Sequence, residues 1–171
     1  FKKSNFFIFE DFLKHRNDLK EENFKNIDFV ILHPQCLKNL EFKNFFDLAI
    51  NTRSFMEMRS SEIKKYFDYL QIALKDNALF YNVNKYHKST SGDDVKIKNY
   101  PYDNNWFVQS SATSWMQANM HEIIAFRRLI SPQETNIAET LSLIKDKNIS
   151  EAKNKNYKIY FKICLRKFLD L

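Results

Sequence analysis

The chain has 171 residues, of which 44% are hydrophobic and 28% are charged, enough for one globular domain with its own core. It holds a single glycine, Gly92, which excludes glycine-rich phosphate loops, dinucleotide fingerprints and nucleophile elbows. No apolar run approaches the roughly 18 residues of a membrane span. The net charge of +6 comes from lysines spread along the chain, so we do not expect nucleic-acid binding.

The two cysteines, Cys36 and Cys164, lie far apart, without a Cys-x-x-Cys motif or a histidine at ligand spacing. We therefore expect no zinc site, and the usage fits a reduced, cytoplasmic protein. The first residue is Phe1 rather than methionine, and no charged-then-apolar signal segment follows it. We interpret the sequence as a piece of a longer protein.

Three short apolar runs predict buried strands: residues 5–9, 27–32 and 46–50. The first ends in Glu10 and Asp11, and Pro34 stops the second because proline lacks a backbone donor. The charged segment at residues 12–24 has scattered apolar positions and predicts a helix.

After the third run, Ser60 or Ser61 is expected to cap a helix that extends to about Lys75. The apolar positions of this helix lie on one face: Ile63, Tyr66, Phe67, Leu70 and Leu74. Asp76-Asn77 is expected to break the helix before a fourth strand at residues 78–83. Strands separated by helical segments predict an α/β fold with a mostly parallel sheet.

The polar residues 84–105 predict a long loop, and residues 106–109 and 121–126 predict a closing pair of strands. Residues 131–134 form a capping-box pattern with proline at the first helical position. The helix that follows places three apolar side chains on one face: Ile137, Leu141 and Ile144. Further aromatic and apolar residues continue at helical spacing: Tyr157, Tyr160, Phe161, Cys164 and Phe168.

The end of the third strand carries the clearest functional signal. The apolar run at residues 46–50 turns polar at Asn51-Thr52-Arg53, just before a helical segment. Open α/β sheets bind ligands outside the carboxyl ends of their strands, so we expect the chemistry at this junction.

The motif Asp47…Asn51…Ser54-Phe55-x-Glu57-Met58 resembles the bacterial sugar O-methyltransferases, a family of class I S-adenosylmethionine-dependent methyltransferases. Supporting segments are Tyr66-Phe67, residues 79–84 and residues 100–106, within a match over residues 27–128. The resemblance implies a Rossmann-like methyltransferase sheet whose N-terminal strand and glycine-rich loop are missing from this sequence, with C-terminal helices. Residues 1–130 would be the partial methyltransferase domain and residues 131–171 a helical extension.

The resemblance also implies a cofactor site for S-adenosylmethionine. Glu10, or Asp11 beside it, would bond the ribose hydroxyls, and Gln35 would lie near the adenine. Asn51 and Thr52 would line the methionine end of the cofactor or the acceptor.

Methyl transfer to a sugar hydroxyl requires alignment of the reactants and a general base for the hydroxyl proton. The candidates are His121 and Glu57. The alternatives are structural: His121 as a surface or capping histidine, and Glu57 in a capping box with Ser54.

For the acceptor, Arg53 could meet an anionic sugar substituent, or it could be a solvated surface residue. Tyr102 and Trp106, with Trp115, could form an aromatic wall against a sugar face, or they could close the core. We expect no metal in this chemistry.

The resemblance thus implies part of an O-methyltransferase that acts on a sugar or surface glycan, which we expect to be cytoplasmic. The main alternative is a non-catalytic, degenerate methyltransferase-like module that docks onto another subunit. Methyl transfer to RNA is a third hypothesis, favoured only by the charge. The acceptor hydroxyl and assembly into a homo-oligomer are left open.

Overall fold

The computed structural model describes residues 5–7, 11, 24, 26–27, 29–30, 42–90, 93–115, 117–130 and 135–145. Several predictions fall outside these residues: Glu10, Gln35, the helix at 12–24, the capping box at 131–134 and the apolar positions at 157–168. The first two predicted strands are present in part. β1 (Phe6–Phe7) pairs in parallel with β2 (Phe29–Val30).

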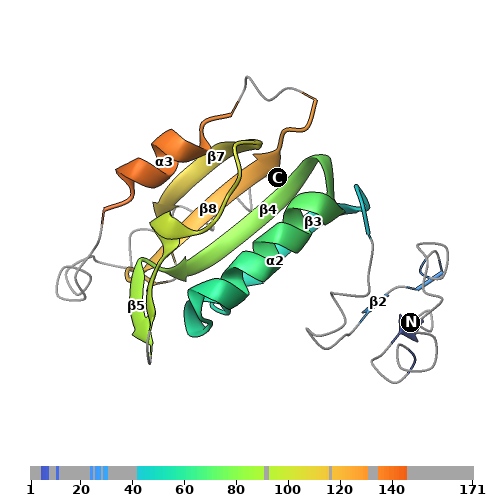
Figure 1. Cartoon of the computed structure of the whole chain (residues 1–171), viewed down its shortest axis with the longest axis horizontal. Helices are drawn as coiled ribbons and strands as arrows, with labels where there is room; N and C mark the ends of the chain where they lie inside the picture. The colour runs from blue at the N-terminus through green and yellow to red at the C-terminus, as the bar shows by residue number, and fades with distance from the viewer. Residues whose placement is uncertain are drawn as a thin grey trace, which may run out of the picture.

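The core of the molecule is a four-stranded sheet in the order β3-β4-β8-β7 (Figure 1). Its strands are β3 (Phe46–Thr52), β4 (Leu74–Lys85), β7 (Trp106–Thr113) and β8 (Met120–Arg127). β3 and β4 are parallel, whereas β8 runs antiparallel to both β4 and β7. The predicted α/β class and the closing pair of strands are confirmed. The sheet is mixed rather than mostly parallel, because β8 is reversed between its neighbours.

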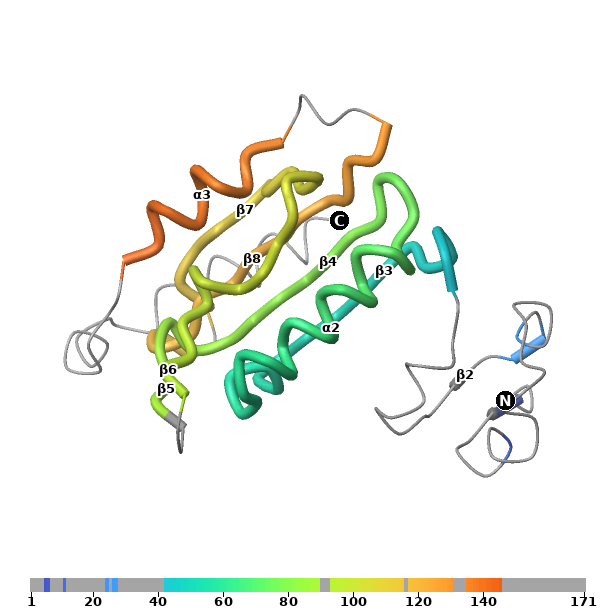
Figure 2. The backbone as a smooth tube through the Cα atoms, viewed as in Figure 1, coloured from blue at the N-terminus to red at the C-terminus, as the bar shows by residue number. Residues whose placement is uncertain are grey.

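The crossover between the parallel strands is the helix α2 (Ser60–Ala73), preceded by a short 3-10 helix, η3 (Phe55–Glu57). Figure 2 follows the chain from β3 through α2 into β4. The predicted apolar face is confirmed, since Ile63 and Phe67 are buried. The predicted serine cap is wrong: the N-cap residue is Arg59, and the Ser60 N–H donates instead to the Asp93 carboxylate at 2.6 Å.

The helix ends before the predicted break at Asp76-Asn77, because Leu74 is already extended and pairs with Phe46 as the first residue of β4. Asp76 and Asn77 instead lie in an irregular part of β4, where the register with β3 shifts. The Asp76 carboxylate accepts hydrogen bonds from the Leu129 and Ile130 N–H groups at 2.7 and 3.2 Å. The polar pair therefore interrupts a strand and does not separate a helix from one.

The predicted long loop at residues 84–105 is wrong. β4 continues to Lys85, and a hairpin of β5 (His87–Thr90) and β6 (Asp93–Lys96) follows, then the 3-10 helix η4 (Ile97–Asn99). Four apolar side chains of this segment are buried in the core: Tyr86, Val95, Ile97 and Tyr100. Charged residues separate these apolar positions, so the segment is polar on average and predicts a loop. Ser91-Gly92 between two short strands is nevertheless a hairpin signal.

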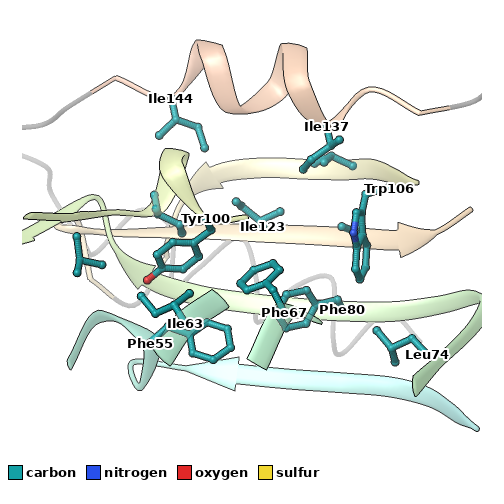
Figure 3. Close-up of a cluster of buried hydrophobic side chains, with 14 of the residues drawn as sticks. Phe55, Ile63, Phe67, Leu74, Phe80, Tyr100, Trp106, Ile123, Ile137 and Ile144 are labelled. Atoms are coloured by element: carbon teal, nitrogen blue, oxygen red, sulfur yellow. The ribbon is translucent and has the colours of Figure 1, made fainter. Parts of the chain in front are cut away.

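The helix α3 (Ile137–Leu143) packs against the same core as α2. In Figure 3, Ile137 and Ile144 point from the α3 segment toward the strands, into the cluster that holds Phe67, Phe80 and Trp106. The predicted apolar face of this helix is confirmed. None of the described helices is long and apolar enough to cross a membrane.

The opposite face of the sheet is more open. Side chains alternate between the two faces of a strand, so Ala49 of β3 packs on the core while Leu48 and Ile50 point away from it. Leu48 and Ile50 are 50% and 62% exposed.

Candidate functional site

Buried amide side chains gather where the parallel strands β3 and β4 end. Asn51 pairs in register with Asn82, and Asn84 follows two residues further on the same face of β4. Asn82 and Asn84 are fully buried and Asn51 is half-buried. We call these three residues and the Tyr102 side chain bonded to them the asparagine cluster.

Hydrogen bonds connect the whole asparagine cluster. The Asn84 amide donates to the side-chain oxygens of Asn51 and Asn82, at 2.9 and 2.6 Å. The Asn82 amide in turn donates to the Tyr102 hydroxyl at 2.9 Å. Asn84 also accepts a hydrogen bond from the Met56 N–H at 3.0 Å. Each buried asparagine is thus held by more than one partner, which fixes its orientation.

The asparagine cluster shapes the turn that follows β3. Asn51 donates to the Ser54 hydroxyl and accepts from the Phe55 N–H at 3.5 Å. The next two side chains, Phe55 and Met56, are buried anchors. The result is a fixed turn whose outer side chains, Thr52, Arg53 and Ser54, are exposed.

Arg53 adopts a left-handed backbone conformation in this turn, with φ of 61°. Its N–H donates to the Val83 carbonyl at 2.7 Å, which ties the turn to β4. In the described part of the chain, two other non-glycine residues have positive φ, Asn44 and Asn77, and asparagine tolerates this region far better than arginine. Arg53 is therefore the strained residue among those that the structure describes, and it lies at the predicted site.

Tyr102 and Trp106 lie in the core. Trp106 is fully buried, and its ring packs edge-on against Tyr102 with centroids 5.5 Å apart. Tyr102 also packs against Phe67 at 4.7 Å, and burial raises the pKa of its hydroxyl above the ordinary value. These contacts match the alternative in which the two aromatics close the core. Trp115 is 48% exposed.

His121 is buried on β8, directly opposite Asn84 of β4 and Thr113 of β7. Its Nε2 atom is 2.7 Å from the Ser111 hydroxyl, and its ring packs edge-on against Tyr86 at 4.8 Å. The alternative of a surface or capping histidine is wrong, since His121 is 5% exposed in the second position of a strand. Facing residues on paired strands are about 5 Å apart, so His121 adjoins the asparagine cluster through Asn84.

A pocket of about 310 Å³ opens beside His121, between the sheet and α3. Its lining combines hydroxyl, imidazole, ammonium and apolar groups: Tyr86, Ser111, Ala112, Thr113, His121, Thr140, Leu143, Ile144 and Lys145. Such a volume lies at the lower end of the roughly 300–1,000 Å³ of small-molecule sites.

Glu57 lies apart from this pocket. It is exposed in η3 and forms an ion pair with Lys88 of the β5–β6 hairpin. The alternative capping box is also wrong, because the Ser54 side chain makes no capping hydrogen bond. Within the described residues, no group of three or more His, Cys, Asp and Glu side chains is arranged to hold a metal ion.

The sequence-based reasoning missed Asn82, Asn84 and Ser111 as candidate site residues. The signal for the first two was present, since asparagine at alternate positions near the end of an apolar strand places two amides on one face. Ser111 gave no such signal, because the pairing of β7 with β8 brings it to His121 across a bulge at residues 108–110.

No protein-family model and no curated protein matches the chain in sequence. Among solved structures, it is similar to a candidate type 11 methyltransferase from Sulfolobus solfataricus, at 13% identity and a TM-score of 0.40, covering 74% of this chain and 72% of that chain. For yhhF, a candidate methyltransferase from Escherichia coli, the values are 12%, 0.40, 73% and 63%. For the PH0226 protein from Pyrococcus horikoshii OT3 they are 9%, 0.42, 74% and 72%. At these values the similarities assign neither a family nor an activity.

Proposed function

We propose that this chain is part of a cytoplasmic, S-adenosylmethionine-dependent O-methyltransferase that acts on the hydroxyl of a sugar or glycan. The observation that carries the proposal is the row of polar groups at one end of the sheet. In that row the asparagine cluster lies beside a buried His121–Ser111 pair that lines a pocket. The sequence motif from Asp47 to Met58, with its resemblance to sugar O-methyltransferases, supports the same function.

The turn after β3 offers a donor set that fits the methionine end of the cofactor. Thr52 and Ser54 present hydroxyls, and Arg53 presents a guanidinium that can pair with a carboxylate in a bidentate manner. The Asn51 amide is already bonded to Ser54 and Asn84, so its role is to hold this turn in place. Glu10 and Gln35 stay predictions for the ribose and adenine ends.

The acceptor would occupy the pocket beside His121. When bound, the cofactor would supply an electrophilic methyl group on a sulfonium centre for transfer to the acceptor oxygen, with the uncharged thioether as the leaving group. Ser111 can donate its hydroxyl proton to His121 Nε2 and accept the acceptor's proton in turn. His121 thereby takes up the proton that the acceptor loses. The Tyr86 ring packs against this histidine, which is buried.

One observation favours the non-catalytic alternative. Leu48 and Ile50 expose apolar side chains on β3, and within the described residues β3 has no strand partner on its outer edge. An apolar, unpaired strand is a surface on which another subunit can dock. This module would need neither His121 nor Ser111.

Measurements of cofactor binding and of methyl transfer distinguish the methyltransferase from the non-catalytic docking module. We would measure S-adenosylmethionine binding by calorimetry, on this chain and on the longest product of its gene, and methyl transfer to a panel of sugars. Substituting Asn51→Ala should weaken cofactor binding. Substituting His121→Asn should leave cofactor affinity unchanged and lower turnover roughly 100-fold or more. Failure of the longer product to bind the cofactor would exclude the methyltransferase.

Two matched controls test the assignment of the base. Ser110 neighbours Ser111 but pairs with Ile124, on the other face of the sheet, so Ser111→Ala should lower turnover while Ser110→Ala should not. Substituting His87→Gln on the exposed β5–β6 hairpin should leave turnover unchanged. Equal losses from both serine substitutions would remove the proposed proton path.

A further inference from the structure

The pocket between the sheet and α3 has two chemically different ends. At its inner end lies the buried His121–Ser111 pair, and beside it the Tyr86 hydroxyl is 2.7 Å from the Thr113 hydroxyl. At its outer end lies Lys145, which is exposed just after α3. A ligand that fills the pocket would therefore meet neutral hydroxyls inside and a positive charge at the rim.

Among the described residues that line the pocket, none carries a carboxylate that could satisfy the charge of Lys145. Lys145 forms no ion pair within the described part of the chain. The hydroxyls of Ser111, Thr113 and Thr140 suit a ligand with several hydroxyl groups. Ala112, Leu143 and Ile144 supply apolar contact for the C–H face of a ring.

We propose that the acceptor is an anionic sugar, with its carboxylate or phosphate at Lys145 and the reacting hydroxyl at Ser111 and His121. This inference rests on the proposed function, because it names the acceptor class of the same site. Arg53, predicted to meet an anionic substituent, does not line the pocket, so the charge contact falls to Lys145. A charge-assisted hydrogen bond is about twice as strong as a neutral one, which favours the anion over a neutral sugar of the same shape.

The test measures sugar binding without cofactor, by calorimetry with glucuronate, glucose 6-phosphate and glucose. The unmodified chain should bind one or both anions roughly tenfold more tightly than glucose. Substituting Lys145→Gln should remove that preference while the affinity for glucose stays the same. Lys43→Gln, an exposed lysine outside the pocket, is the matched control and should change nothing. A preference for glucuronate over glucose 6-phosphate identifies the carboxylate as the recognised group, and the reverse identifies the phosphate.

Three outcomes would overturn the inference: no binding by any of the three sugars, equal binding of glucose and the anions, or an unchanged preference in Lys145→Gln. Because Lys145 is exposed, its substitution does not threaten folding. The inference and the proposed function fail separately. Anion binding through Lys145 without methyl transfer would refute the function alone, and methyl transfer to neutral sugars at equal rates would refute the inference alone.

Discussion

Two polar clusters lie in the same core at opposite ends of the sheet. At one end, Arg127 closes β8 and donates to the Asp103 carboxylate, at 2.7 Å to Oδ2, and to the Gln71 carbonyl at 3.0 Å. Its guanidinium also lies over the Trp106 ring, 5.0 Å from the centroid. We call this group the arginine cluster. At the other end, where β3 and β4 finish, lies the asparagine cluster, which holds no charge.

The two clusters differ in where their hydrogen bonds lead. The hydrogen bonds of the arginine cluster go to backbone carbonyls and to residues within the cluster, so through them the cluster has no connection to an exposed segment of the described chain. The hydrogen bonds of the asparagine cluster continue through Asn51 to the exposed turn after β3. Asn84 of this cluster also lies directly opposite His121 on the neighbouring strand. A closed, charged cluster supports the framework, whereas an uncharged cluster with an open end can position a ligand site without a large desolvation penalty. This contrast predicts different responses to substitution.

The largest effect is expected from Asp103→Ala. The substitution leaves the Arg127 guanidinium buried without its carboxylate, which should lower the free energy of unfolding by about 3 kcal/mol or more. Urea denaturation measures the change. Asp47→Ala is the control, because its ion pair with Lys75 is exposed and contributes about 0–1 kcal/mol. Equal losses would show that Arg127 is not buried as described.

The next largest effect is expected from Asn84→Ala. The Met56 N–H and the Asn82 oxygen lose their partner, so the free energy of unfolding should fall by about 2 kcal/mol. Cofactor binding should weaken as well, because the turn after Asn51 loses its support. Asn104→Ala, at an exposed asparagine, serves as the control. A loss of stability with unchanged cofactor binding would show that the asparagine cluster does not support the cofactor site.

How far the sequence predicts the fold depends on how local each signal is. The apolar face of α2 and the strand β8 each depend on residues within a single element, and both were predicted. The cap of α2 was not predictable from its neighbours, because Asp93 reaches Ser60 from a hairpin 33 residues away. The hairpin itself was hidden because Val95 and Ile97 are flanked by charged side chains.

Prediction of the site likewise depends on how local each signal is. Asn51 was predicted as a candidate because it ends a local apolar run, and the structure places it next to two buried amides. Its role in cofactor binding stays a prediction. Ser111, Thr140 and Lys145 were not named, because their proximity to His121 arises from strand pairing and from the packing of α3. A tertiary contact of this kind cannot be predicted from the residue type at any single position of the sequence.

A smaller effect is expected from Tyr102→Phe, at the inner end of the asparagine cluster. Removing the hydroxyl leaves the Asn82 amide without its acceptor and should lower the free energy of unfolding by about 1 kcal/mol. Tyr100→Phe is the matched control, because the buried Tyr100 hydroxyl has no hydrogen-bond partner within the described residues. Its loss should be neutral or stabilising. Thermal unfolding of both variants measures the difference, and equal changes would contradict the assigned Asn82–Tyr102 bond.

The smallest effect, opposite in sign, is expected from Arg53→Gly. Glycine accepts the positive φ of this position without the Cβ penalty, so the free energy of unfolding should rise by up to about 1 kcal/mol. Asn44→Gly, where asparagine already tolerates a φ of 49°, should give no such gain. Cofactor binding should fall in Arg53→Gly alone, since only that variant loses the guanidinium proposed to meet the carboxylate. A gain in stability with full cofactor binding would mean that the strained turn serves the fold of β3 and β4 rather than the ligand.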